Sequence, residues 1–131
     1  MDVSCAIIRR GSEILAVRRP AGAKNGGKWE FPGGKLEPGE AAEDCLRREL
    51  REELEIEVVL REALPAYRHD YPDFSIRLLP FVCELAGGDP VLREHSQARW
   101  AEPAELRGID WAEADRKALE AFIGRYRAGR G

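Results

Sequence analysis

Apolar residues recur along the chain with two different periods, which predict where strands and helices form. Short apolar runs rich in β-branched or aromatic residues, bounded by turn-forming residues, predict strands, and apolar residues three and four apart predict helices. The predicted strands are residues 3–8, 14–17, 29–31, 58–68, 74–85 and 98–101, the predicted helices are 41–54 and 112–126, and 32–34 is a predicted irregular turn. This order predicts an α/β (α+β) fold with a mixed β-sheet between helices. With no linker or repeat in 131 residues, we expect a single domain, residues 1–131.

The first predicted helix carries an acidic stripe beside an apolar one. Glu49, Glu52 and Glu53 project from one side, because residues three or four apart are neighbours on a helix. Leucines at every fourth position form the adjoining stripe, which we expect to pack. Carboxylate oxygens suit Mg²⁺ or, alternatively, Mn²⁺, and Mg²⁺ takes its remaining ligands from water and substrate phosphates. The same stripe could instead be a solvated surface, because the whole region is charged.

The spacing upstream favours the metal interpretation. Gly34, Glu40 and the block Arg48-Glu49-Leu50-x-Glu52-Glu53-x-x-Ile56 follow at intervals that resemble the signature of the Nudix hydrolases. Within that superfamily the chain looks most like the MutT type of nucleoside triphosphate pyrophosphohydrolase. The likeness extends over nearly the entire chain, through Arg18-Arg19-Pro20, Trp29 to Lys35, Tyr71-Pro72-Asp73, and Glu94 six residues before Trp100.

The resemblance implies the Nudix fold and Mg-dependent hydrolysis of a nucleoside triphosphate to nucleoside monophosphate and pyrophosphate. Such a reaction needs a metal to neutralise the phosphates and to lower the pKa of a bound water. The implied metal ligands are Glu49, Glu52, Glu53 and the carbonyl oxygen of Gly33. Glu94 matches the family's extra carboxylate, which either holds metal or takes the proton of the water.

Three cationic residues belong to the part of the predicted site that would bind the phosphates. Arg48 lies about 100° around the helix from Glu49, so we expect it to pair with a carboxylate and fix its orientation. Arg19 and Lys35 are the candidates for phosphate contact, one as a bidentate donor and the other as a point charge. Arg18 should point the other way, since strand neighbours alternate faces.

The base pocket is less clearly marked. Phe31 and Phe74 are candidates for stacking on the base, although an aromatic residue in a strand is as readily part of the core. Asp115 stands where the oxidised-guanine-specific enzyme has an asparagine, and the segment around it is similar to the CTP pyrophosphohydrolase branch. Because an ionised carboxylate only accepts hydrogen bonds, Asp115 should favour an edge rich in N–H groups, as in cytosine or guanine. Alternatively, Asp115 merely complements the helix dipole. The substrate could therefore be 8-oxo-dGTP or CTP-like.

Two residues depart from the family pattern. Glu55 replaces a glycine at the helix end, which predicts either a strained left-handed residue, at roughly 1 to 2 kcal/mol, or a helix that ends differently. Ala41 replaces a capping Ser or Thr, so the cap is either missing or supplied by Glu40. His69 and His95 are solitary, and we expect both to be ordinary surface or loop residues.

Composition limits the partners and the location. Cys5, Cys45 and Cys83 are odd in number and widely separated, which predicts reduced core thiols. A formal charge of −3 and a pI near 5.5 argue against a nucleic-acid polymer and leave a small nucleotide as the partner. The chain has neither an apolar run of about 20 residues nor a signal-like start, so we expect no membrane association and a cytoplasmic monomer or homodimer. The alternatives are hydrolysis of another diphosphate, such as a dinucleotide or nucleotide sugar, and a non-catalytic nucleotide-sensing module.

Overall fold

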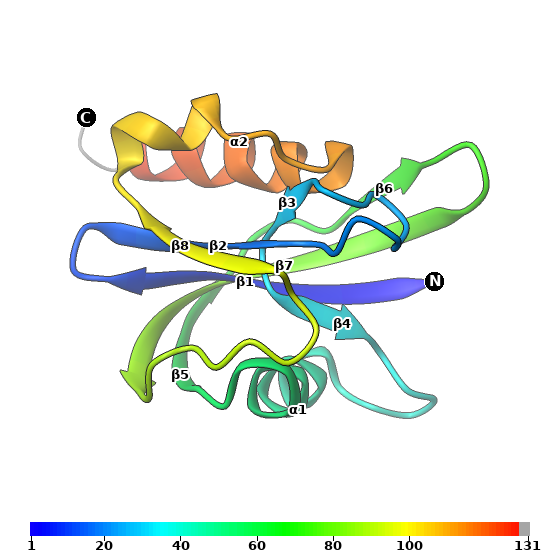
Figure 1. Cartoon of the computed structure of the whole chain (residues 1–131), viewed down its shortest axis with the longest axis horizontal. Coiled ribbons are helices and arrows are strands. Elements are labelled where there is room, and N and C mark those ends of the chain that lie inside the picture. The colour runs from blue at the N-terminus through cyan, green and yellow to red at the C-terminus, as the bar shows by residue number, and fades with distance from the viewer. Residues whose placement is uncertain (129–131) are drawn as a thin grey trace.

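The computed structural model describes residues 1–128 and shows one sheet with a helix against each face (Figure 1). The elements are β1 (Asp2–Arg10), β2 (Glu13–Arg18), β3 (Trp29–Glu30), β4 (Gly33–Lys35), α1 (Ala42–Leu54), β5 (Glu57–Ala63), β6 (Tyr67–Asp70), β7 (Ser75–Gly87), β8 (Gln97–Ala101), the 3-10 helix η1 (Pro103–Gly108) and α2 (Glu113–Ala128). The main strand order is β3-β2-β1-β7-β5, while β4 pairs with β1, β6 with β7 and β8 with β2. β1 and β7 are parallel and the other pairs are antiparallel, which confirms the predicted mixed sheet.

The central strand β1 is buried on both faces because the two helices cover opposite sides of the sheet. Ala6 and Ile8 belong to the apolar cluster beneath α1, with the leucines of the predicted stripe. Ile7 belongs to the other cluster, beneath α2, with Leu119. This division follows from the alternation of side chains along a strand.

Helix α1 begins and ends as its unusual terminal residues predict. Ala41 provides no side-chain cap, and Glu40 does not replace it, because Oε1 of Glu40 accepts instead from the N–H of Glu37 at 3.0 Å. Glu55 has φ 55° and ψ 40°, the left-handed conformation that normally suits glycine. Of the two predicted alternatives, the strained left-handed residue is therefore the one confirmed.

Two expectations about the strands were wrong in detail. The predicted strand 58–68 is split into β5 and β6, because Pro65 lacks an N–H and interrupts the pairing. The predicted turn at 32–34 is instead the entry to strand β4, which pairs with β1. There Gly33 lies so close to β1 that a Cβ would stand 2.0 Å from the carbonyl oxygen of Ser4.

Two predictions from composition can be compared with the structure. Cys5, Cys45 and Cys83 are all free and buried, which confirms the core assignment. None of the helices within residues 1–128 has the length and apolarity needed to cross a lipid bilayer.

Candidate active site

Arg48 gathers the carboxylates at one side of α1. Its guanidinium donates from Nε to Oε2 of Glu40 at 2.8 Å and from Nη2 to Oε1 at 2.9 Å. Its Nη1 donates to Oε1 of Glu49 at 3.0 Å and to Oε2 of Glu52 at 3.3 Å. These bonds raise the pKa of Arg48 and lower the pKa of Glu40 to about 2. The predicted pairing of Arg48 with carboxylates is confirmed, and its effect on activity stays a prediction.

The glycines of β4 allow α1 to approach the sheet at its acidic side. A Cβ on Gly34 would stand 2.3 Å from Cδ of Glu49, so only glycine leaves room for that carboxylate where it lies. Glu53 is partly buried nearby. Burial raises the pKa of Glu53, and the hydrogen bond and negative charge of Glu49 raise it further. Two carboxylates thus share a confined place, an arrangement that a bound cation would stabilise.

The predicted metal ligands lie close together along α1 but are not arranged as a finished metal site. Across the part of the chain that the structure describes, no three His, Cys, Asp or Glu side chains converge on one point. Glu52 turns toward Arg48 with 60% of its side chain exposed, and Glu94 is exposed in the loop between β7 and β8. The oxygen donors and the mutual repulsion of Glu49 and Glu53 nevertheless fit a hard divalent cation.

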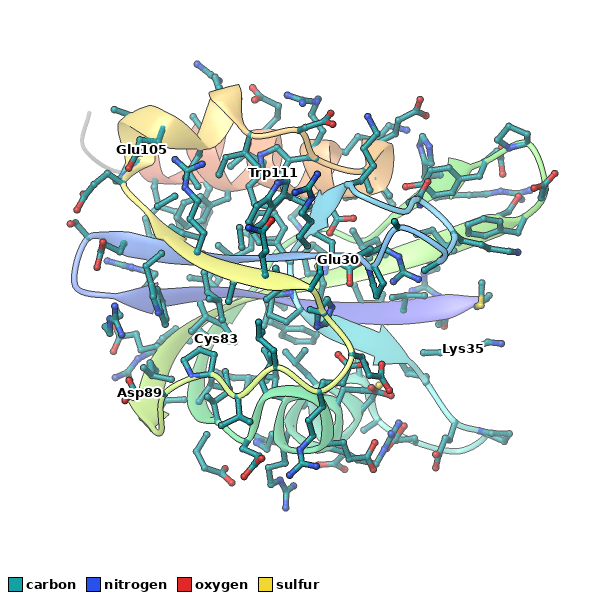
Figure 2. All side chains as sticks on the ribbon, in the orientation of Figure 1. Glu30, Lys35, Cys83, Asp89, Glu105 and Trp111 are labelled. Carbon is teal, nitrogen blue, oxygen red and sulfur yellow. The ribbon has the colours of Figure 1, made fainter. Side chains whose placement is uncertain are left out.

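A cavity of about 440 Å³ collects most of the other predicted site residues. Its wall includes Arg19, Phe31, Gly33, Lys35, Glu53, Phe74, Glu94 and Asp115. Arg48, Glu49 and Glu52 are not part of the wall and lie beside it on α1. Figure 2 shows Glu30, which also lines the cavity, near the middle of the molecule, and Lys35 at its outer edge. A second cavity of about 450 Å³, between the β1–β2 turn and α2, contains none of the predicted residues.

Asp115 differs from its predicted state. It is buried in the first turn of α2, and its Oδ1 accepts the N–H of Phe31 at 2.9 Å. Burial raises the pKa of Asp115 well above its usual range, and the negative charge of Glu30 raises it further. The protonated carboxyl is thus favoured, and it donates as well as accepts. Burial thus works against the ionised carboxylate on which the acceptor-only argument from the sequence rests.

The two candidate stacking residues have different surroundings. Phe31 is 2% exposed and its ring stacks on Trp111 with centroids 4.4 Å apart, so it is mainly a core residue. Phe74 is partly buried, stacks on Tyr71 at 4.8 Å, and has Nζ of Lys24 at 4.3 Å from its ring centroid. The ring of Phe74 is therefore more accessible to a flat ligand than the ring of Phe31.

The hairpin that bears Phe74 also holds the N-terminus of α2. The Tyr71 hydroxyl accepts the N–H of Ala114 at 3.0 Å, and the Tyr67 hydroxyl donates to the Ala114 carbonyl. These two bonds attach β6 and the residue that follows it to the helical turn that contains Asp115. The base end of the cavity is consequently built from residues far apart in sequence.

The model of the NUDIX domain family matches residues 1–122 of this chain. The chain belongs to the Nudix family. It is 38% identical over 123 residues to the CTP pyrophosphohydrolase of Escherichia coli K12, covering 94% of this chain and 91% of that protein. It is 36% identical over 115 residues to the putative 8-oxo-dGTP diphosphatase 2 of Mycobacterium tuberculosis H37Rv, covering 87% and 82%. The solution structure of the E. coli ORF135 protein superposes with a TM-score of 0.83 at 36% identity, covering 97% and 91%.

These matches confirm the predicted family, fold and enzyme class. The chain is a Nudix hydrolase of the MutT type, and its relatives are named as enzymes that act on nucleotide phosphoanhydride bonds. Nudix hydrolases generally use a divalent metal, usually Mg²⁺, and act on small nucleotide substrates. The acidic side of α1 carries Glu49, Glu52 and Glu53, which belong to the Nudix signature and also offer the oxygen atoms that such a metal prefers.

The two predicted phosphate-binding cations of this Nudix hydrolase, Arg19 and Lys35, differ from each other in their contacts. Arg19 lines the cavity but is already engaged, with Nη1 donating to Oε1 of Glu30 at 3.3 Å and Nε to the carbonyl of Lys24 at 2.6 Å. Lys35 is exposed at the wall. Arg18 points away, as predicted, and donates to the carbonyl of Gly27 at 2.8 Å.

Sequence reasoning missed two polar residues of the cavity and misjudged the histidines. Nε2 of His95 lies 2.9 Å from Oε2 of Glu30, and the imidazole is only 5% exposed. His69 is also buried, with Nε2 3.1 Å from Oε2 of Glu113. The surface assignment was wrong for both rings, because each is buried and pairs with a carboxylate from a distant segment, although His95 does lie in a loop. The available signals were the position of Glu30 within the family-like segment at 29–35 and that of His95 directly after Glu94.

Proposed function

We propose that this Nudix hydrolase cleaves a nucleoside or deoxynucleoside triphosphate to the monophosphate and pyrophosphate, with Mg²⁺ as cofactor. The observation that carries the proposal is the composition of the 440 Å³ cavity. Carboxylates, cations and a buried hydrogen-bonding group, represented by Glu53, Arg19 and Asp115, line one space. A triphosphate attached to a base needs all three kinds of group.

At the phosphate end, Glu49, Glu52, Glu53, Glu94 and the carbonyl oxygen of Gly33 are the proposed metal ligands. When bound, the metal would neutralise phosphate charge and make a water more acidic. Arg48 holds Glu49 and Glu52 in place through its hydrogen bonds.

The other groups of this end act on the phosphates and on the proton of the attacking water. Arg19 and Lys35 bind the phosphates. The guanidinium of Arg19 then contacts both a phosphate and Glu30. Glu53 and Glu94 are the two candidates to take the proton.

At the base end, the protonated carboxyl of Asp115 acts as an amide does, donating and accepting at once. This supports a base edge that offers both kinds of group, which cytosine and 8-oxoguanine each do. The similarity to a CTP pyrophosphohydrolase at 38% identity favours cytosine, and the similarity to a putative 8-oxo-dGTP diphosphatase supports the second substrate. Phe74 is the proposed stacking residue.

A substrate panel tests this proposal. Purified protein with Mg²⁺ is incubated with CTP, dCTP, 8-oxo-dGTP, dGTP, a nucleotide sugar and a dinucleotide, and the products are separated. We expect monophosphate and pyrophosphate from the cytosine nucleotides or 8-oxo-dGTP. Cleavage confined to the nucleotide sugar or dinucleotide would contradict the proposal.

The ligand assignment has its own test. Glu52→Gln removes a proposed metal ligand, so we expect kcat to fall by at least about 100-fold, as metal-site and electrostatic losses of this kind do. Glu43→Gln is the matched control, since Glu43 is exposed in the first turn of the same helix. Unchanged hydrolysis by Glu52→Gln at saturating Mg²⁺ would refute the assignment. The single domain, the cytoplasmic location and the monomeric or homodimeric state stay predictions.

A further inference from the structure

The loop at residues 88–96 carries Glu94 to the cavity and is attached to the protein on both sides of that residue. On one side Arg93 donates to Oε2 of Glu55 at 2.6 Å, which ties the loop to the end of α1. On the other side His95 pairs with Oε2 of Glu30 at 2.9 Å, which ties it to β3. The Glu94 loop, shown in yellow-green in Figure 1, joins β7 to β8 and passes beside α1.

The two attachments differ in burial, and this decides which one controls the loop. The side chains of Arg93 and Glu55 are 58% and 45% exposed, and exposed ion pairs contribute little because water screens them. The side chains of His95 and Glu30 are 5% and 18% exposed. A hydrogen bond in such surroundings is stronger, and losing one partner leaves a buried polar group unsatisfied.

The ring of His95 has a single polar contact in the described part of the chain. Its Nδ1 is buried there without a hydrogen-bond partner, so the bond from Nε2 to Glu30 orients the imidazole. Glu30 is itself held by Nη1 of Arg19 at 3.3 Å. The anchor is therefore a fixed carboxylate rather than a mobile one.

We infer that His95 is a positioning residue that holds Glu94 at the cavity through its hydrogen bond to Glu30. This inference rests on the proposed function, in which Glu94 holds metal or takes a proton. Because His95 follows Glu94 directly, a rotation of its ring or backbone displaces the neighbouring carboxylate. A misplacement of about 1 Å is enough to lower a rate by about 100-fold.

Two substitutions test whether the hydrogen bond to Glu30, rather than the presence of any polar side chain at position 95, sets the activity. His95→Gln extends an amide N–H to about the position of Nε2, whereas the amide of His95→Asn is too short to reach Glu30. We expect His95→Asn to lower kcat at least about tenfold with KM within twofold, and His95→Gln to retain most of kcat, as for other partners that orient a catalytic ligand. Arg93→Gln is the control for the exposed attachment and should stay within twofold of wild type. Circular dichroism and urea unfolding establish that each variant is folded.

A double-mutant cycle with Glu94→Gln tests whether His95 acts through Glu94. In the Glu94→Gln background, His95→Asn should lower kcat by less than twofold further. A full additional loss, a rise in KM at unchanged kcat, or equal kcat for the Asn and Gln variants would overturn the inference.

The same cycle distinguishes failure of this inference from failure of the proposed function. Unchanged kcat in Glu94→Gln alone would remove the role of Glu94, and the positioning role with it, while leaving the hydrolase activity intact. Absence of triphosphate hydrolysis by the wild-type protein would contradict the proposed function itself.

Discussion

The backbone N–H of Phe31 donates a hydrogen bond to Oδ1 of Asp115 at 2.9 Å, joining residues 84 positions apart. The bond holds a carboxyl in a buried place beside Glu30, where its pKa is raised. At low pH the Asp115 carboxyl is protonated in both the folded and the unfolded protein. As the pH rises above about 4, the unfolded chain ionises this group first, so stability is lost until the pH passes the folded-state pKa.

Asp115→Asn should therefore stabilise the protein, and more so at higher pH. The amide oxygen of asparagine still accepts the hydrogen bond from Phe31, and the amide does not ionise as the pH rises. We expect a gain of about 1 kcal/mol or more at pH 7.5 and a smaller gain at pH 5, measured by urea unfolding. Glu43→Gln is the control, because Glu43 is an exposed acid in the first turn of α1. It should instead lose about 0.3 to 1 kcal/mol at pH 7.5, and equal gains for Asp115→Asn at both pH values would contradict the burial argument.

Arg48→Lys should lower activity although it keeps the positive charge. A lysine cannot reproduce the forked bonds to Glu40 together with the contacts to Glu49 and Glu52. We expect kcat to fall by about 10- to 100-fold, as when a partner that orients a metal ligand is removed. Arg47→Lys is the control, since Arg47 is exposed and its ion pair is with Asp44 at 3.5 Å. Matching kcat values in the two variants would rule out an orienting role.

Adjacent glycines of β4 should respond differently to alanine. In Gly33→Ala the new Cβ meets the Ser4 backbone at 2.0 Å, which cannot yield, so we expect a stability loss of about 1 to 3 kcal/mol or more. In Gly34→Ala it meets the flexible Glu49 side chain at 2.3 Å, so the fold persists while kcat falls at least about tenfold. Gly108→Ala has open space around it and serves as the control. Thermal unfolding and kcat are measured on all three, and full activity in Gly34→Ala would count against a catalytic position for Glu49.

The left-handed residue after α1 gives a prediction about stability alone. Glu55→Gly and Glu55→Ala both remove the exposed pair with Arg93, but only glycine adopts φ 55° without strain. We expect the glycine variant to be more stable than the alanine variant by about 1 kcal/mol in urea unfolding. Equal stabilities would show that the helix end relaxes when Glu55 is replaced.

The sequence by itself determined the features that depend on local spacing. The acidic and apolar stripes of α1 follow from a 3.6-residue period, so the helix and the place of Glu49, Glu52 and Glu53 could be predicted. For Glu55, which stands where the family pattern has glycine, the sequence left two outcomes open, and the structure shows the left-handed one. These relationships span a few residues and need no knowledge of the rest of the chain.

Only the tertiary structure decided what depends on contacts between distant segments. The pairing of β4 with β1, the bond between His95 and Glu30, and the buried state of Asp115 each join parts of the chain that local patterns do not relate. The last case changed a chemical conclusion, because burial beside another carboxylate changes the protonation of an aspartate, and its neighbours in sequence do not reveal that burial.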